Sequence, residues 1–211
     1  MAVICPTVTA ENPHQYREQI ERVAPFASHV HIDFMDGDFT PNESPGLGQA
    51  WWPHTMQADL HIMFKNPQDF NEQIIKLNPR LVIVHAESEG NFVELAEVLH
   101  GAGIMAGVAL LPKTDVKTII PALEHIDHVL IFSGSLGHFG GEADTSLLDK
   151  VEQLKKLKHS IEIGWDGGIN DQNIKKLSDF GVDVLNVGGY IHHDKNAEQA
   201  YKKLVAILAT P

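Results

Sequence analysis

The sequence is poor in cysteine and in basic residues. Its single cysteine, Cys5, cannot form an intrachain disulfide, which is consistent with a reducing compartment. We expect Cys5 to be a small buried side chain on the first strand. Only 16 Lys and Arg residues accompany 28 Asp and Glu, giving a formal net charge of −12. Because nucleic-acid binding depends on neutralising phosphates with basic side chains, this balance argues against a nucleic-acid partner.

Long apolar segments are also missing. No run approaches the roughly 20 residues that a membrane-spanning helix needs. The first ten residues, MAVICPTVTA, do not combine a basic region with a long apolar one, as a secretory leader would. We therefore expect a cytoplasmic protein with no membrane partner.

Short β-branched runs alternate with segments of helical period along the whole chain. Strands are predicted at 2–8, 29–34, 58–64, 81–87, 105–111, 128–134, 161–166 and 182–188. Helices are predicted near 12–24, 45–56, 67–77, 91–101, 115–123, 145–157, 171–180 and 196–208, and the segment 45–56 is the weakest of these.

Eight strand–helix units without a linker or a shift in composition predict one α/β domain, a (β/α)8 barrel over residues 1–211. An open doubly wound sheet is the alternative. The first strand–helix turn, CPTVTAEN, lacks a G-x-G-x-x-G fingerprint, which argues against a dinucleotide-binding version of that sheet.

Polar side chains cluster where three predicted strands end. His31 and Asp33 in HIDFMDG share one face of their strand, His61 follows in ADLHIMF, and Asp166 ends the seventh strand in IEIGWDGG. Each is open to a structural reading, as a hydrogen-bonded core histidine or a helix-capping aspartate. In a barrel all four meet at one rim, and two nitrogens with two oxygens suit a divalent zinc, iron, manganese or cobalt ion.

Glycine pairs follow the last three strands, in HFGGE at 138–142, DGG at 166–168 and VGGY at 187–190. Such glycines can simply make tight turns. Because barrels commonly bind phosphate through loop backbone at these positions, three consecutive glycine loops favour an anion cradle.

The motifs HIDFMDG, DFTPN, DLHIM, VHAE, FGG, WDGGIN and the final VGG resemble the ribulose-phosphate 3-epimerase family in order and spacing, over essentially the whole chain. This resemblance implies a metal-dependent isomerase that interconverts D-ribulose 5-phosphate and D-xylulose 5-phosphate, with no organic cofactor. It also implies a homo-oligomer.

The resemblance assigns roles to particular residues. The implied metal ligands are His31, Asp33, His61 and Asp166, and the implied acid/base pair is Asp33 and Asp166. The implied substrate-binding residues are Thr7, Met35, Met63, Gly140, Gly141, Gly168, Gly188 and Gly189. The chemistry is consistent with these roles, because inverting a carbon beside a ketone requires proton removal from one face and proton return on the other.

Departures from the family pattern lie mainly in the loop FSGSLGHFGGE, where Phe132 replaces a methionine, and at Gly189, which replaces a common serine. Two alternatives therefore stay open. One is a lyase or aldolase of the same barrel superfamily, such as a hexulose-phosphate synthase, although no lysine occurs in HIDFMDG or DLHIM. The other is a non-catalytic sugar-phosphate-binding protein, although binding alone would not need two acid/base carboxylates.

Overall fold

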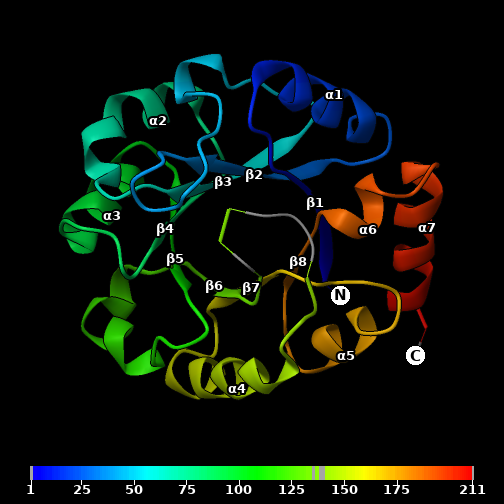
Figure 1. Cartoon of the computed structure of the whole chain (residues 1–211). Helices are drawn as coiled ribbons and strands as arrows, with labels where there is room; N and C mark the ends of the chain where they lie inside the picture. Colours follow the sequence, from blue (N-terminus) through cyan, green and yellow to red (C-terminus); the bar gives the residue numbers. More distant parts are fainter. Residues whose placement is uncertain (1, 135, 138–140, 211) are drawn as a thin grey trace.

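The computed structural model describes residues 2–134, 136–137 and 141–210, and eight parallel strands form a closed barrel within them. The strands are β1 (Val3–Val8), β2 (His29–Met35), β3 (Gln57–Met63), β4 (Leu81–His85), β5 (Met105–Leu110), β6 (His128–Phe132), β7 (Glu162–Asp166) and β8 (Val184–Val187). Figure 1 looks along the barrel, with the strands inside a ring of helices. Because β8 pairs with β1, the (β/α)8 prediction is confirmed and the open sheet is wrong.

Helices cover the outside of the barrel. The α-helices are α1 (Pro13–Val23), α2 (Asn71–Leu77), α3 (Phe92–Gly101), α4 (Leu148–Leu157), α5 (Ile174–Asp179), α6 (Gly189–His192) and α7 (Ala197–Leu208). The 3₁₀ helices are η1 (Leu47–Gln49), η2 (Pro67–Phe70), η3 (Val116–His125) and η4 (Thr145–Leu147). The main core lies between these helices and the outward side chains of the strands.

The helix predicted at 45–56 is wrong. Only the single 3₁₀ turn η1 forms there, because Pro45 and Pro53 bracket the segment and glycine lowers helix propensity inside it. Tertiary contacts hold the segment instead, including a 2.9 Å hydrogen bond from the Tyr16 hydroxyl to the Trp51 carbonyl. Similarly, the segment predicted as a helix at 115–123 is the 3₁₀ helix η3, with Pro121 inside it.

A charged network closes the end of the barrel at which the strands begin. Arg80, directly before β4, donates to Asp59 at 2.6 and 2.7 Å and to Glu162 at 3.1 Å from both terminal nitrogens. His29 lies 2.9 Å from Asp59, and His128 lies 2.7 Å from Glu162. The guanidinium therefore holds two carboxylates from different strands under the barrel.

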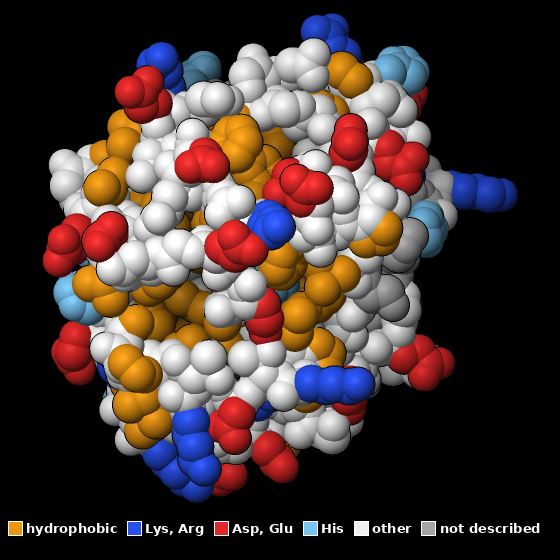
Figure 2. Space-filling model, turned by 60° about the vertical axis from the view of Figure 1, so that its left-hand side comes forward, with side chains coloured by type: hydrophobic (Ala, Val, Ile, Leu, Met, Phe, Trp, Pro, Cys, Tyr) orange, Lys and Arg blue, Asp and Glu red, His pale blue; other side chains and the backbone are white. Residues whose placement is uncertain are grey.

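The surface matches the acidic composition. Figure 2 shows acidic side chains spread over one face of the molecule, between hydrophobic ones. Within the described residues, no helix is both long and apolar enough to cross a membrane.

Candidate active site and metal centre

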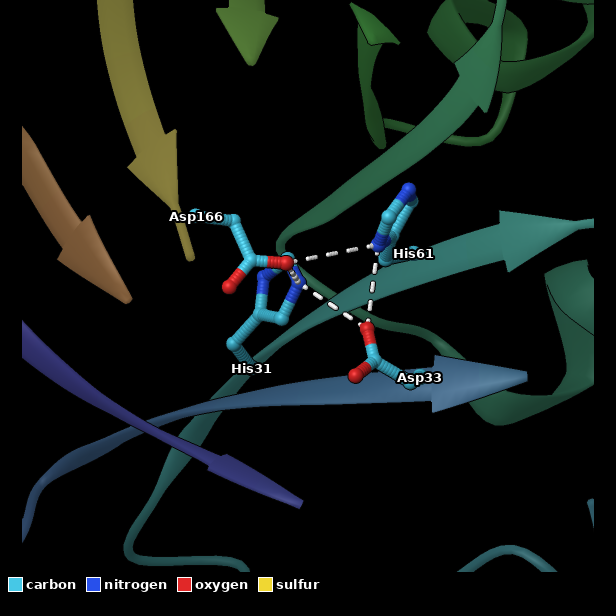
Figure 3. Close-up of side chains that lie close together, drawn as sticks. All are labelled: His31, Asp33, His61 and Asp166. Carbon is cyan, nitrogen blue, oxygen red and sulfur yellow. Dashed lines mark hydrogen bonds and ion pairs between the residues drawn. The ribbon is translucent and has the colours of Figure 1, made fainter. Parts of the chain in front are cut away.

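Two histidines and two aspartates converge inside the barrel from β2, β3 and β7 (Figure 3). Asp33 and His61 are register partners in neighbouring strands, and the Nδ1 of His61 lies 3.0 Å from Oδ1 of Asp33. The Nε2 of His31 lies 3.3 Å from the same oxygen. Asp166 approaches from β7, with Oδ2 3.9 Å from each of these two nitrogens. The four side chains each offer a ligand atom within 4.8 Å of the others.

The donor set fits a divalent metal ion. Both histidines are fully buried, and the aspartates are 7% and 9% exposed. The Nδ1 atom of His31 is buried and makes no hydrogen bond within the described residues. Burying unpaired polar atoms is unfavourable unless a ligand takes them up, and imidazole with carboxylate is a common ligand set for zinc, iron, manganese and cobalt.

The two aspartates have opposite electrostatic environments. Burial and the nearby charge of Asp33 raise the pKa of Asp166. Burial alone would raise the pKa of Asp33 too, but hydrogen bonding and charge from His31 and His61 outweigh it and lower that pKa. Asp33 also accepts a hydrogen bond from the Thr9 hydroxyl. Asp166 therefore holds its proton more strongly than Asp33 does.

A second layer of polar residues lies behind His61. The Nε2 of His61 faces the Nε2 of His85 at 2.9 Å, and the Nδ1 of His85 lies 3.5 Å from Oε2 of Glu87. Glu87 in turn accepts a hydrogen bond from the Thr114 hydroxyl. Phe39 also packs against the His85 ring, with 4.8 Å between ring centroids. His61 is thereby held from the side away from Asp33.

An open cavity of about 670 Å³ lies above the cluster. Its lining brings together most of the residues predicted to bind substrate, namely Thr7, Met63, Gly141, Gly168, Gly188 and Gly189, with both aspartates. Met35 is buried beside Met63 but does not line the cavity. Gly140 lies outside the described residues.

Close packing of two loops requires glycine after β7. A Cβ at Gly167 would come within 2.3 Å of the backbone of Gly134, and one at Gly168 within 2.1 Å of the backbone of Ala143. Both glycines also have positive φ, at +109° and +71°. At Gly168 the need for glycine is thus explained by packing, and the same packing brings its backbone to the cavity.

The polar residues of this region that were missed by the sequence reasoning include Thr9, which donates to Asp33, as well as His85 and Asn186. His85 belongs to VHAE, but the sequence does not reveal that its ring reaches His61. Asn186 interrupts the otherwise apolar strand β8 and lines the cavity. The residue as a whole is only 2% exposed. A polar residue inside a strand that is buried on both faces is the signal that could have found it.

Fold and site together define a class of protein: a (β/α)8 barrel with a buried group of potential metal ligands beneath a glycine-lined cavity. The model of the ribulose-phosphate 3 epimerase family matches residues 3–192, and the chain belongs to this family. The family prediction from sequence is therefore confirmed.

Named relatives agree with this membership. The chain is 32% identical over 209 residues to a ribulose-phosphate 3-epimerase of Helicobacter pylori, with 95% of each chain covered. It is 28% identical over 210 residues to a ribulose-phosphate 3-epimerase of Schizosaccharomyces pombe, with 96% of this chain and 92% of the other covered.

Solved structures share the fold at lower identity. A 3-hexulose-6-phosphate synthase from Salmonella typhimurium superposes with a TM-score of 0.71 at 16% identity, covering 97% of both chains. A 3-keto-L-gulonate-6-phosphate decarboxylase from Vibrio cholerae gives a TM-score of 0.72 at 13% identity, covering 98% of this chain and 97% of the other. At these identities the likeness describes the barrel alone.

Proposed function

We propose that this protein is a metal-dependent ketose-phosphate 3-epimerase that interconverts D-ribulose 5-phosphate and D-xylulose 5-phosphate. The observation that carries the proposal is the meeting of Asp33 and Asp166, from β2 and β7, at the bottom of a cavity that could admit a sugar phosphate. Family membership supports the same activity.

The two carboxyl groups would share the proton transfers. One removes the proton from carbon 3, next to the ketone, and the other returns a proton to the opposite face of the resulting enediolate. In the reverse reaction their roles exchange. Met63 and Phe132 line the same cavity and offer apolar contact surface that helps to exclude water from the reacting carbon.

A divalent ion would be held by His31, Asp33, His61 and Asp166, whose spacing and burial fit one. When bound, it supplies positive charge that stabilises the negative charge developing on the ketone oxygen. Zinc, iron, manganese and cobalt all suit this donor set.

The phosphate would lie against the glycine loops. Gly141, Gly168, Gly188 and Gly189 bring backbone to the cavity, and backbone N–H groups can bind an anion without nearby lysine or arginine. We extend this proposal to Gly140, as expected from the sequence.

His85 should act as a positioning residue for the metal ligand His61. If His61 binds the ion through Nδ1, its proton resides on Nε2 and His85 accepts it at 2.9 Å. Substituting His85→Leu should weaken metal affinity about 10–100-fold. His85→Gln, whose amide oxygen can accept the same hydrogen bond, should retain most of it. Competition with a fluorescent chelator measures both dissociation constants without reference to turnover, and equal affinities in the two variants would contradict the role.

The alternative functions have less support. Among the described residues that line the cavity there is no lysine, which weakens the lyase or aldolase alternative. A protein that only binds a sugar phosphate would not require two converging carboxylates. Cytoplasmic location and homo-oligomer formation stay predictions, and light scattering would test the second.

The proposed reaction can be tested in deuterated water. Metal-loaded protein should convert ribulose 5-phosphate into xylulose 5-phosphate that carries deuterium at carbon 3, since the returned proton comes from a carboxyl group that exchanges with solvent. NMR spectroscopy follows both the product and the label. Inversion without label would exclude transfer through two exchanging carboxyls, and the absence of both signals would refute the epimerase assignment for this sugar.

A further inference from the structure

Asn186 is a buried polar residue of the cavity to which the proposed mechanism gives no role. Its residue is 2% exposed, and neither Oδ1 nor Nδ2 makes a hydrogen bond within the described residues. Asn186 nevertheless lines the cavity above the metal centre. A buried amide with both polar atoms unpaired destabilises the protein that contains it, so a contact made on ligand binding is a reason for its presence.

The position of Asn186 indicates which part of a ligand it meets. In the barrel register, Asn186 pairs with Asp166 on one side and with Cys5 on the other. Gly188, in the glycine loop, follows two residues later, about 7 Å along an extended chain. The amide thus lies beside the proton-transferring carboxyl and before the loop proposed to hold the phosphate.

The chemistry of the amide narrows the choice of ligand group. A phosphate or carboxylate would use only the Nδ2 donor, whereas a hydroxyl group can accept from Nδ2 and donate to Oδ1. We propose that Asn186 hydrogen-bonds to the hydroxyl group on the carbon between the reacting carbon and the phosphate-bearing carbon, which is carbon 4 of a pentulose 5-phosphate. This inference rests on the proposed function, because the orientation of the sugar follows from placing its reacting carbon at the acid/base pair and its phosphate at the glycine loops.

Asn186 would therefore be a specificity-determining residue. Sugar phosphates with a hydroxyl at this carbon satisfy the amide, whereas a deoxy analogue leaves it buried and unpaired. The variant Asn186→Leu replaces the amide with an apolar side chain of similar size. The variant should thus raise the stability of the ligand-free protein and weaken its recognition of the hydroxyl group.

The test compares the wild type with Asn186→Leu on ribulose 5-phosphate and on its 4-deoxy analogue. We expect the wild type to favour the parent sugar about tenfold in kcat/KM, the loss expected for one unmade hydrogen bond, and the variant to show little preference. The ligand-free variant should melt about 2–4 °C higher than the wild type. Asn12→Leu removes an amide that accepts from the Gln15 N–H at 3.0 Å, so this control should melt lower and keep the sugar preference.

Each other outcome overturns the assignment. A lower melting temperature for Asn186→Leu would mean that the amide stabilises the fold. An unchanged preference for the parent sugar would mean that Asn186 does not recognise the hydroxyl, even if kcat falls through its neighbour Asp166. If the wild type turns over neither sugar, the proposed reaction fails on its own. In that case, calorimetry measures the affinity of the wild type for ribulose 5-phosphate and for its 4-deoxy analogue. Equal affinities, or no binding of either sugar, would refute the hydroxyl contact.

Discussion

Substituting Asp166→Asn should lower kcat for epimerisation by about 10²–10⁴-fold while the barrel stays folded. Asn has nearly the same shape as Asp, but it cannot take up or release the proton at carbon 3. Asp33 remains, so one epimer should still exchange its carbon 3 proton with deuterated water without inverting. The other epimer should not exchange, because its proton faces the missing carboxyl. NMR measurement of both sugars separates these half-reactions.

Two controls make this result specific. Asp166 is also a proposed metal ligand, so the metal content of Asp166→Asn must be measured and activity compared at saturating metal. Asp179→Asn alters an exposed aspartate on α5 that pairs with Lys175 at 2.6 Å, and it should leave kcat unchanged. The acid/base role would be refuted if metal-loaded Asp166→Asn inverted either sugar at the wild-type rate.

Substituting Arg80→Met should destabilise the protein by about 3–5 kcal/mol at pH 7, because it removes the arginine that Asp59 and Glu162 share at the end of the barrel where the strands begin. The side chain of Asp59 is 1% exposed, so its charge cannot be rehydrated without opening the structure. Urea unfolding measures the change as a shift in the midpoint at constant slope.

The stability lost in Arg80→Met should depend on pH, and the lowered pKa values of its two carboxylate partners give the direction. Burial would raise the pKa of Glu162, but hydrogen bonds from His128 and Arg80 lower it to about 2, and the pKa of Asp59 is lowered by His29 and Arg80. A lowered carboxyl pKa stabilises the folded state above the unfolded pKa of about 4 and does so less as pH falls. The difference in free energy of unfolding between wild type and Arg80→Met should therefore be largest above about pH 5 and should shrink between about pH 4 and pH 2.

An exposed arginine provides the matched control. Arg17 lies 3.9 Å from Glu21 on the surface of α1, so Arg17→Met should change stability by less than about 1 kcal/mol. Arg80→Lys keeps a positive charge but lacks the paired N–H donors, so its loss of stability should lie between those of Arg17→Met and Arg80→Met. Equal stability of Arg80→Met and Arg17→Met would show that the network contributes little.

Much of the barrel could be predicted because its signals are local. All eight strands were found, with ends shifted by a few residues, since β-branched runs bounded by turns mark buried strands. The helix predicted at 45–56, the weakest of the eight, fails for a local reason too, because Pro45, Pro53 and the glycines between them disfavour a helix. The 3₁₀ form of η3 shows the same effect at Pro121.

The sequence by itself determined the barrel and the four residues of the proposed metal centre, because alternation along a strand and the parallel order of strands place His31, Asp33, His61 and Asp166 at one rim. It determined the family through the order and spacing of its motifs. Tertiary structure alone decided which side chains meet across strands. His85 reaches His61, and Asn186 lies beside Asp166, because the stagger between neighbouring strands sets their heights in the barrel. Arg80 joins Asp59 to Glu162 because the barrel brings together strands that are distant in sequence. No local pattern encodes that stagger, so these contacts could not be predicted from the sequence.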